Sequence, residues 1–145
     1  MRILGIDYGS KRVGLAMSDP SGAFAQPYSV VKNSKSLIAE INTIVLEEGV
    51  SEIVLGESKN FKGQDNTVME KIREFKTALE KETELSVVFE PEFLSSHQAA
   101  YFQGKHDLLD ASAAAIILQS YLDRKKNIWL TLTILVKWKL ALAKF

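Results

Sequence analysis

RILGIDY at residues 2–8 and RVGLAMS at residues 12–18 are two short apolar runs separated by a polar turn at 9–11. Short apolar runs bounded by turn-forming residues are typical of strands that pair as a hairpin. A third strand is expected at 27–32, after a second turn at 20–22. The chain is therefore predicted to open with three antiparallel strands.

The apolar pattern after the third strand changes to the spacing of helices. A first helix is expected behind the candidate caps Asn33 and Ser34, with Gly49 as its end. The remaining expected elements are a strand at 51–56, a helix at about 65–82, a strand at 84–89, and helices at about 95–103 and 109–125. The order βββαβαβαα predicts an α/β fold of the ribonuclease-H-like kind, a mixed five-stranded sheet flanked by helices.

The composition excludes several kinds of site. The chain has no cysteine and only two histidines, which excludes thiolate zinc sites, disulfides and cysteine nucleophiles and leaves carboxylates as metal ligands. The 18 basic and 18 acidic residues cancel, so nucleic acid could be bound only by a local patch. Asp7 interrupts the first apolar run too early for a signal peptide, which predicts a cytoplasmic protein.

The C-terminal segment 127–145 does not fit this scheme. It holds both tryptophans and three lysines with no acid. Its apolar run is about half of the roughly 20 residues that a membrane-spanning helix needs, so no membrane anchor is expected. We predict one domain of the ribonuclease-H-like kind at 1–126 and an apolar, basic tail at 127–145 of unknown role. A packing strand, a packing helix, and an interfacial or dimer contact remain alternatives for this tail.

Three carboxylates occupy positions where strands end or helices begin. Asp7 closes the first strand, and Gly9 two residues later would let a phosphate approach the backbone. Asp110 precedes the small residues 111–115, which would let the last helix pack close to the sheet near Asp7. Glu92 follows the last strand, where open α/β sheets place their sites. Together the three could hold Mg²⁺ or Mn²⁺, although a turn, a helix cap and a solvated loop would explain them equally well.

Four stretches resemble the signature regions of the YqgF family, also called RuvX, of Holliday-junction-resolvase-like nucleases. They are GIDYGSKRVGLAMSD, LGESKNFKG, EPEFLSSHQA and LLDASAAAIILQSYLD, in the family's order over residues 1 to about 125. The resemblance implies a ribonuclease-H-like hydrolase that cleaves phosphodiester bonds, in 5′-end processing of pre-16S rRNA during ribosome biogenesis. Asp7, Glu92 and Asp110 match its catalytic, metal-binding acids. A Holliday-junction resolvase is the nearest alternative function.

The third stretch departs from the family pattern. Pro91 and Phe93 stand where the family has an Asp and an Arg, which leaves open a catalytically weak, nucleic-acid-binding ribosome-assembly factor. Glu57 is either an extra ligand or an exposed loop residue. The candidate substrate contacts are Gly9, Lys11, Arg12, Lys59 and Lys105, and for each cation a solvated surface position is equally compatible. The expected partners are structured RNA or branched DNA and pre-ribosomal particles, bound by a monomer or a homodimer.

Overall fold

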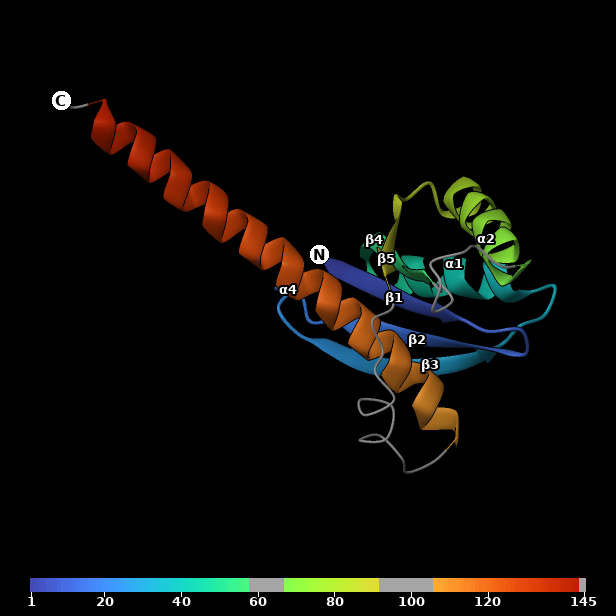
Figure 1. The fold of residues 1–145 in the computed structure, drawn as a ribbon. Helices are drawn as coiled ribbons and strands as arrows, with labels where there is room; N and C mark the ends of the chain where they lie inside the picture. Colours follow the sequence, from blue (N-terminus) through green and yellow to red (C-terminus); the bar gives the residue numbers. More distant parts are fainter. Residues whose placement is uncertain (58–66, 92–105, 144–145) are drawn as a thin grey trace.

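The computed structural model describes residues 1–57, 67–91 and 106–143 (Figure 1). The strands are β1 (Arg2–Tyr8), β2 (Arg12–Ser18), β3 (Ala25–Lys32), β4 (Val50–Glu57) and β5 (Val87–Pro91). The helices are α1 (Leu37–Glu48), α2 (Thr67–Thr83) and α4 (His106–Leu142). The helix expected at 95–103 lies outside the described residues.

The five strands form one sheet in the order β3-β2-β1-β4-β5. β1, β2 and β3 pair antiparallel, whereas β4 and β5 run parallel to β1. The predicted mixed sheet is therefore confirmed. Because β1, β4 and β5 are parallel, their carboxyl ends meet at one edge, the edge that carries Asp7.

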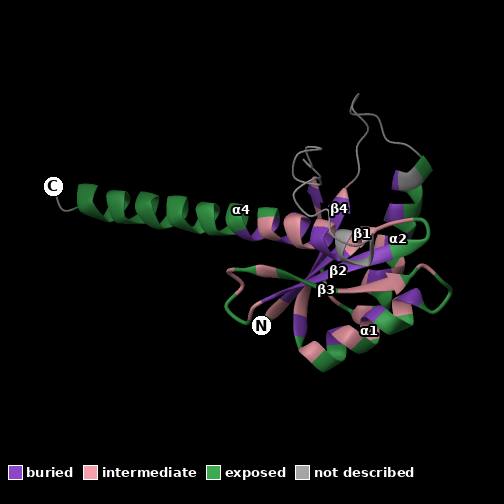
Figure 2. Cartoon of the chain, turned by 90° about the horizontal axis from the view of Figure 1, so that it is seen from below, coloured by how far each residue is buried: buried purple, intermediate pink, exposed green. Residues whose placement is uncertain are grey.

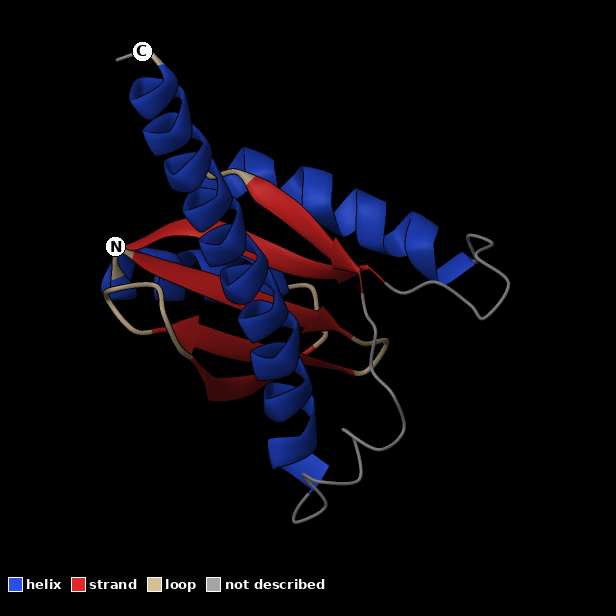
Figure 3. Cartoon of the chain, turned by 60° about the vertical axis from the view of Figure 1, so that its left-hand side comes forward, coloured by secondary structure: helices blue, strands red, loops and turns tan. Residues whose placement is uncertain are grey.

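Helices cover both faces of this sheet (Figure 3). On one face, apolar residues of α1 and α2 pack with Leu4, Ile6 and Leu15 in the larger core cluster. On the other face, α4 crosses the sheet and forms a second cluster around the buried Leu118 and Val54. Alternate residues of β1, β2 and β4 thus pack in two different cores, which is why these strands are nearly continuous apolar runs.

β3 is an edge strand, and its sequence suits that position. Pro27 lacks the N–H that an inner strand would need, and edge strands tolerate this loss. The register with β2 shifts so that Leu15 faces Ser29 while Ala16 faces Pro27, which leaves Tyr28 as the extra residue of a bulge. The strand starts at Ala25, two residues before the predicted start at 27.

The predicted cap of α1 and the predicted start of β5 are wrong. The residue that caps α1 is Ser36, not Asn33 or Ser34, and its hydroxyl donates to Glu40 Oε1 at 2.6 Å rather than capping the backbone. Gly49 does end α1 in the left-handed conformation, as predicted. The strand expected from residue 84 begins instead at Val87, because α2 continues to Thr83.

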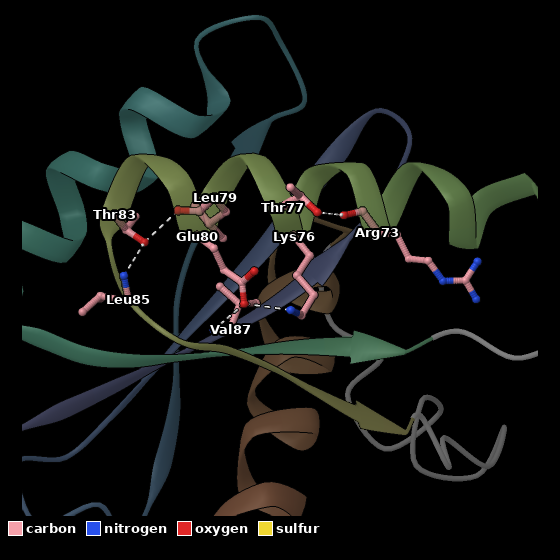
Figure 4. A network of polar contacts seen from close by, with 8 residues as sticks. All are labelled: Arg73, Lys76, Thr77, Leu79, Glu80, Thr83, Leu85 and Val87. Atoms are coloured by element: carbon pink, nitrogen blue, oxygen red, sulfur yellow. Dashed lines mark hydrogen bonds and ion pairs between the residues drawn. The ribbon is translucent and has the colours of Figure 1, made fainter.

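The end of α2 is held against the start of β5 by polar contacts (Figure 4). Glu80 accepts a hydrogen bond from Lys76 Nζ at 2.7 Å and another from the backbone N–H of Val87 at 3.3 Å. The hydrogen bond from Lys76 lowers the pKa of the Glu80 carboxyl. At the last residue of α2, the Thr83 side-chain oxygen Oγ1 accepts a hydrogen bond from the N–H of Leu85 at 3.3 Å. These contacts explain why residues 84–86 form a turn rather than the first part of a strand.

α4 continues well beyond the predicted helix end at residue 125. It contains 37 residues and holds no glycine or proline that would stop it. Leu122 is its last buried residue, and every later residue up to 143 is exposed (Figure 2). The tail is thus helical, but it is exposed, with Trp129 and Trp138 on its surface, and is not the packing helix that was one alternative. Among the described residues, no helix meets the length and apolarity needed to cross a membrane.

Candidate active site

Asp7 lies near the carboxyl end of β1, on the face of the sheet that α4 covers. Side chains two residues apart along a strand share a face, so Asp7 shares one with Gly5 and Ile3. Ile3 packs in the α4 cluster, and a Cβ on Gly5 would lie 2.7 Å from Leu118 Cβ in α4. The half-buried Asp7 side chain is therefore directed to the α4 side.

Gly14 brings the start of α4 onto this face. A Cβ on Gly14 would overlap the carbonyl oxygen of Asp110 and lie 3.0 Å from the backbone nitrogen of Ala111. Gly14 is also the residue directly opposite Asp7 in the β1–β2 pair. Opposed residues have their Cα atoms about 4.5–5.5 Å apart, so Asp110 sits over the immediate neighbour of Asp7.

This contact confirms the predicted approach of the last helix to the strand that carries Asp7. The predicted catalytic roles of Asp7 and Asp110 stay predictions. Gly14 itself was not among the predicted site residues. A glycine inside an apolar strand is a known signal of close backbone approach, and this signal could have identified it.

The Asp110 carboxylate is incompletely satisfied. Its Oδ2 atom is buried and accepts no hydrogen bond from any described group. Arg12 Nε lies 3.1 Å from this oxygen, which is ion-pair distance. A buried carboxylate oxygen without a hydrogen bond is costly, and a bound cation is one way to offset that cost.

Basic residues lie on the same side of the site. Arg12 begins β2 and is directly opposite Lys32, the last residue of β3. Lys11 precedes Arg12 in the turn, and its backbone carbonyl accepts a hydrogen bond from the N–H of Asn33 at 2.9 Å. The structure thus brings two predicted substrate contacts, Lys11 and Arg12, to the edge that carries Asp7. Lys32 was not predicted to contact substrate.

Gly9 is needed by the turn itself. A Cβ on Gly9 would collide with the backbone carbonyl of Arg12, and the Gly9 carbonyl accepts a hydrogen bond from Asn33 Nδ2 at 2.8 Å. The close approach seen at Gly9 is therefore internal to the hairpin. A phosphate contact at Gly9 stays a prediction.

Two glutamates, Glu57 and Glu90, lie at or near the carboxyl ends of β4 and β5. Glu57 is the last residue of β4 rather than a loop residue, and alternation from Val54 places it on the α1–α2 face, opposite Asp7. Glu90 is buried in β5, where it accepts a hydrogen bond from Ser120 Oγ at 3.1 Å and pairs with Arg124. Neither arrangement favours metal binding beside Asp7 and Asp110.

The other predicted site residues lie outside the described residues. They are Glu92, Lys59 and Lys105. Within residues 1–57, 67–91 and 106–143, no group of three acidic or histidine side chains is close enough together to bind a metal ion. The structure therefore brings Asp7 and Asp110 together and leaves the third predicted ligand untested.

A model of the family described as "RuvX: Holliday junction resolvase" matches residues 1–124 of the chain. The chain belongs to the RuvX family. Two curated relatives are named "Putative pre-16S rRNA nuclease". The protein of Maridesulfovibrio salexigens is 36% identical over an alignment of 134 residues, and the match covers 86% of this chain and 99% of the relative. That of Clostridium tetani is 39% identical over an alignment of 137 residues, and the match covers 88% of this chain and 99% of the relative.

Solved structures with a similar fold include two resolvases bound to DNA. The T. thermophilus RuvC protein in complex with a Holliday junction substrate matches with a TM-score of 0.59 at 16% identity, covering 87% of this chain and 96% of RuvC. The fowlpox virus resolvase in complex with Holliday junction DNA matches with a TM-score of 0.54 at 13% identity, covering 86% and 98%. At these identities the likeness shows a shared fold. The RuvX chain thus has the resolvase-like, ribonuclease-H-like fold that its sequence predicted.

Proposed function

We propose that this RuvX-family chain is a metal-dependent nuclease that hydrolyses phosphodiester bonds at the sheet edge carrying Asp7 and Asp110. One observation carries the proposal: Gly14 lets α4 place Asp110 over the strand position next to Asp7. Two acidic residues from different elements then lie on neighbouring positions, with Arg12 paired to Asp110. Such a cluster would be costly without a counter-charge, and it suits a site that holds cations and phosphates.

The side chains present fit Mg²⁺ or Mn²⁺. Carboxylate oxygens are the ligands that these hard cations prefer, and Asp110 Oδ2 is a buried oxygen without a hydrogen bond among the described groups. Asp7 and Asp110 would hold the ion, with Glu92 as the third ligand. The ion would supply Lewis-acid polarisation of the scissile phosphate and activation of water. Arg12 is placed to balance charge when a phosphate group enters beside Asp110.

The substrate that the relatives' names indicate is the precursor of 16S rRNA. We propose 5′-end processing of this RNA, in pre-ribosomal particles in the cytoplasm, as the biological role. A four-way DNA junction is the second substrate to test, because the family description names a Holliday junction resolvase. Cutting a junction symmetrically would require a dimer, whereas rRNA processing would not.

The proposed function is tested by incubating the purified chain with a structured pre-16S rRNA fragment and with a four-way DNA junction. Mg²⁺, Mn²⁺ and EDTA are compared for each substrate. Cleavage that requires the cation supports the nuclease and identifies its preferred nucleic acid. Binding without cleavage under every condition would overturn the enzyme and favour an assembly factor.

We also propose that residues 1–126 are the functional domain and that 127–145 are dispensable to it. The family match ends at residue 124, and 86% of this chain already covers 99% of one relative. Arg124 and Lys125, which pair with Glu90 and Glu52, lie inside the proposed domain. The exposed part of α4 therefore adds no contact that the described domain needs.

A chain ending at Lys126 is expected to keep the free energy of unfolding of the full chain within about 0.5 kcal/mol, since it loses only exposed residues. Its cleavage rate should also be unchanged. Removal of ten exposed large apolar side chains should reduce self-association. Urea unfolding, cleavage and light scattering on both chains measure these effects. Loss of folding or of cleavage in the short chain would contradict the domain assignment.

A further inference from the structure

A groove beside Asp110 is lined by three cations and, among the residues that the structure describes, by no acid. It has a volume of about 750 Å³ and runs between β3 and the start of α4. Three of its lining residues are the cations Lys11, Arg12 and Lys32, while Tyr28 and Ala111 line its sides. Arg12 pairs with Asp110, and Ala111 follows Asp110 in α4, so the groove opens directly at the candidate active site.

The position of Lys32 beside Arg12 is expected to lower the stability of the folded chain. Lys32 and Arg12 are register partners in an antiparallel pair, so their side chains emerge on the same face side by side. Like charges placed directly opposite one another destabilise a sheet. Among the described residues, no carboxylate lies within ion-pair distance of Lys32. The described fold thus gives the exposed Lys32 no partner of opposite charge, whereas a bound polyanion would supply one.

We propose that this groove binds the phosphodiester backbone of a single nucleic-acid strand beside the bond that is cleaved, with Lys32 as a phosphate contact. The proposal rests on the nuclease function proposed above and adds the path of the substrate. Several phosphates in a row match a row of cations, and neither a neutral nor an acidic ligand does. Tyr28 lines the groove at the β3 bulge, but its hydroxyl donates to Glu48 of α1, so the phosphate contacts of the proposal rest on the cations alone.

The test measures binding of a fluorescein-labelled single-stranded RNA of about 12 nucleotides, and of the DNA of the same sequence, by anisotropy in EDTA. Lys32→Gln is expected to raise Kd about fivefold at about 0.1 M salt and to reduce the slope of log K against log salt by about 0.7, the value for one phosphate contact on a single strand. Lys32→Arg should restore both quantities. The RNA and DNA arms show which strand is preferred.

Lys35→Gln is the matched control, because Lys35 is exposed three residues further on and does not line the groove. It should leave Kd and the salt slope unchanged. The Tm of Lys32→Gln should equal or exceed that of the wild type, because one of two opposed like charges is removed. A lysine with a structural role would instead lower the Tm when replaced.

The outcomes separate this proposal from the proposed function. Unchanged binding and salt slope in Lys32→Gln would overturn the groove even if the wild type cleaves RNA. Equal losses of affinity in Lys32→Gln and Lys35→Gln would also overturn it, because the effect would then come from the net charge of the protein and not from the groove. Binding that depends on Lys32 without any cleavage would support the groove and overturn the nuclease.

Discussion

Asp7→Asn and Asp110→Asn are each expected to reduce metal-dependent cleavage at least about a hundredfold, because a metal at the scissile phosphate supplies several kcal/mol of transition-state stabilisation. Each substitution keeps the size of the side chain and removes one of the charges that would hold the ion. The rate is measured on the preferred substrate in single-turnover assays at saturating protein. In the proposed site both residues would hold the same ion, and the Asp110 backbone does lie over the strand neighbour of Asp7, so neither loss should be rescued by the other residue.

A second measurement separates loss of the metal site from loss of the fold. In EDTA the Tm of both variants should be close to that of the wild type. Adding Mg²⁺ or Mn²⁺ should raise the Tm of the wild type, because ligands that bind only the folded state stabilise it, and should raise that of the variants much less. Asp123→Asn provides the same chemical change on an exposed part of α4, and it should behave as the wild type. Full cleavage by either site variant would rule out the proposed metal site.

The sheet and one half of the site could be predicted from local pattern. The hairpin of β1 and β2 has the predicted bounds, and the helix after β3 ends at Gly49 as expected. The small residues after Asp110 correctly indicated that the last helix could approach the sheet. These features depend on neighbours in the sequence or on side-chain size, both of which a single sequence displays.

The remaining features depend on contacts that pattern does not display. Glu90 lies just past the strand expected at 84–89, yet it is buried in β5, where Arg124 and Ser120 of α4 contact it. Lys32 looked like a residue at the end of a strand, and only the register with β2 places it opposite Arg12. The end of α4 was missed for another reason. No residue in this segment stops a helix, so α4 continues through residues that are exposed.

Gly14→Ala is expected to disrupt both stability and activity, because there is no room for a methyl group between β2 and α4. Its Cβ would overlap backbone atoms of Asp110, which cannot move away as the end of a flexible side chain could. Overpacking of a core commonly costs 1–3 kcal/mol, and with rigid backbone at the contact we expect about 3 kcal/mol or more. Urea unfolding of the variant and the wild type measures this cost.

Gly14→Ala should also reduce cleavage, because it changes the position of Asp110 without removing a carboxylate. If α4 shifts to accommodate the methyl group, Asp110 moves away from Asp7 while both carboxylates remain present. A displacement of about 1 Å at a catalytic group can reduce a rate about a hundredfold, so cleavage should fall under conditions in which the variant is still folded.

Gly49→Ala is the control for this prediction. Gly49 has a φ of 64°, with open space around its Cβ position, and lies between α1 and the amino end of β4, away from the sheet edge that carries Asp7. Alanine there should cost about 1–2 kcal/mol for the left-handed conformation and leave cleavage unchanged. If Gly14→Ala folded as stably as the wild type and cleaved at the same rate, α4 would not lie on β2 as described. The proposed nuclease would then lose its main support, which is the proximity of Asp7 and Asp110.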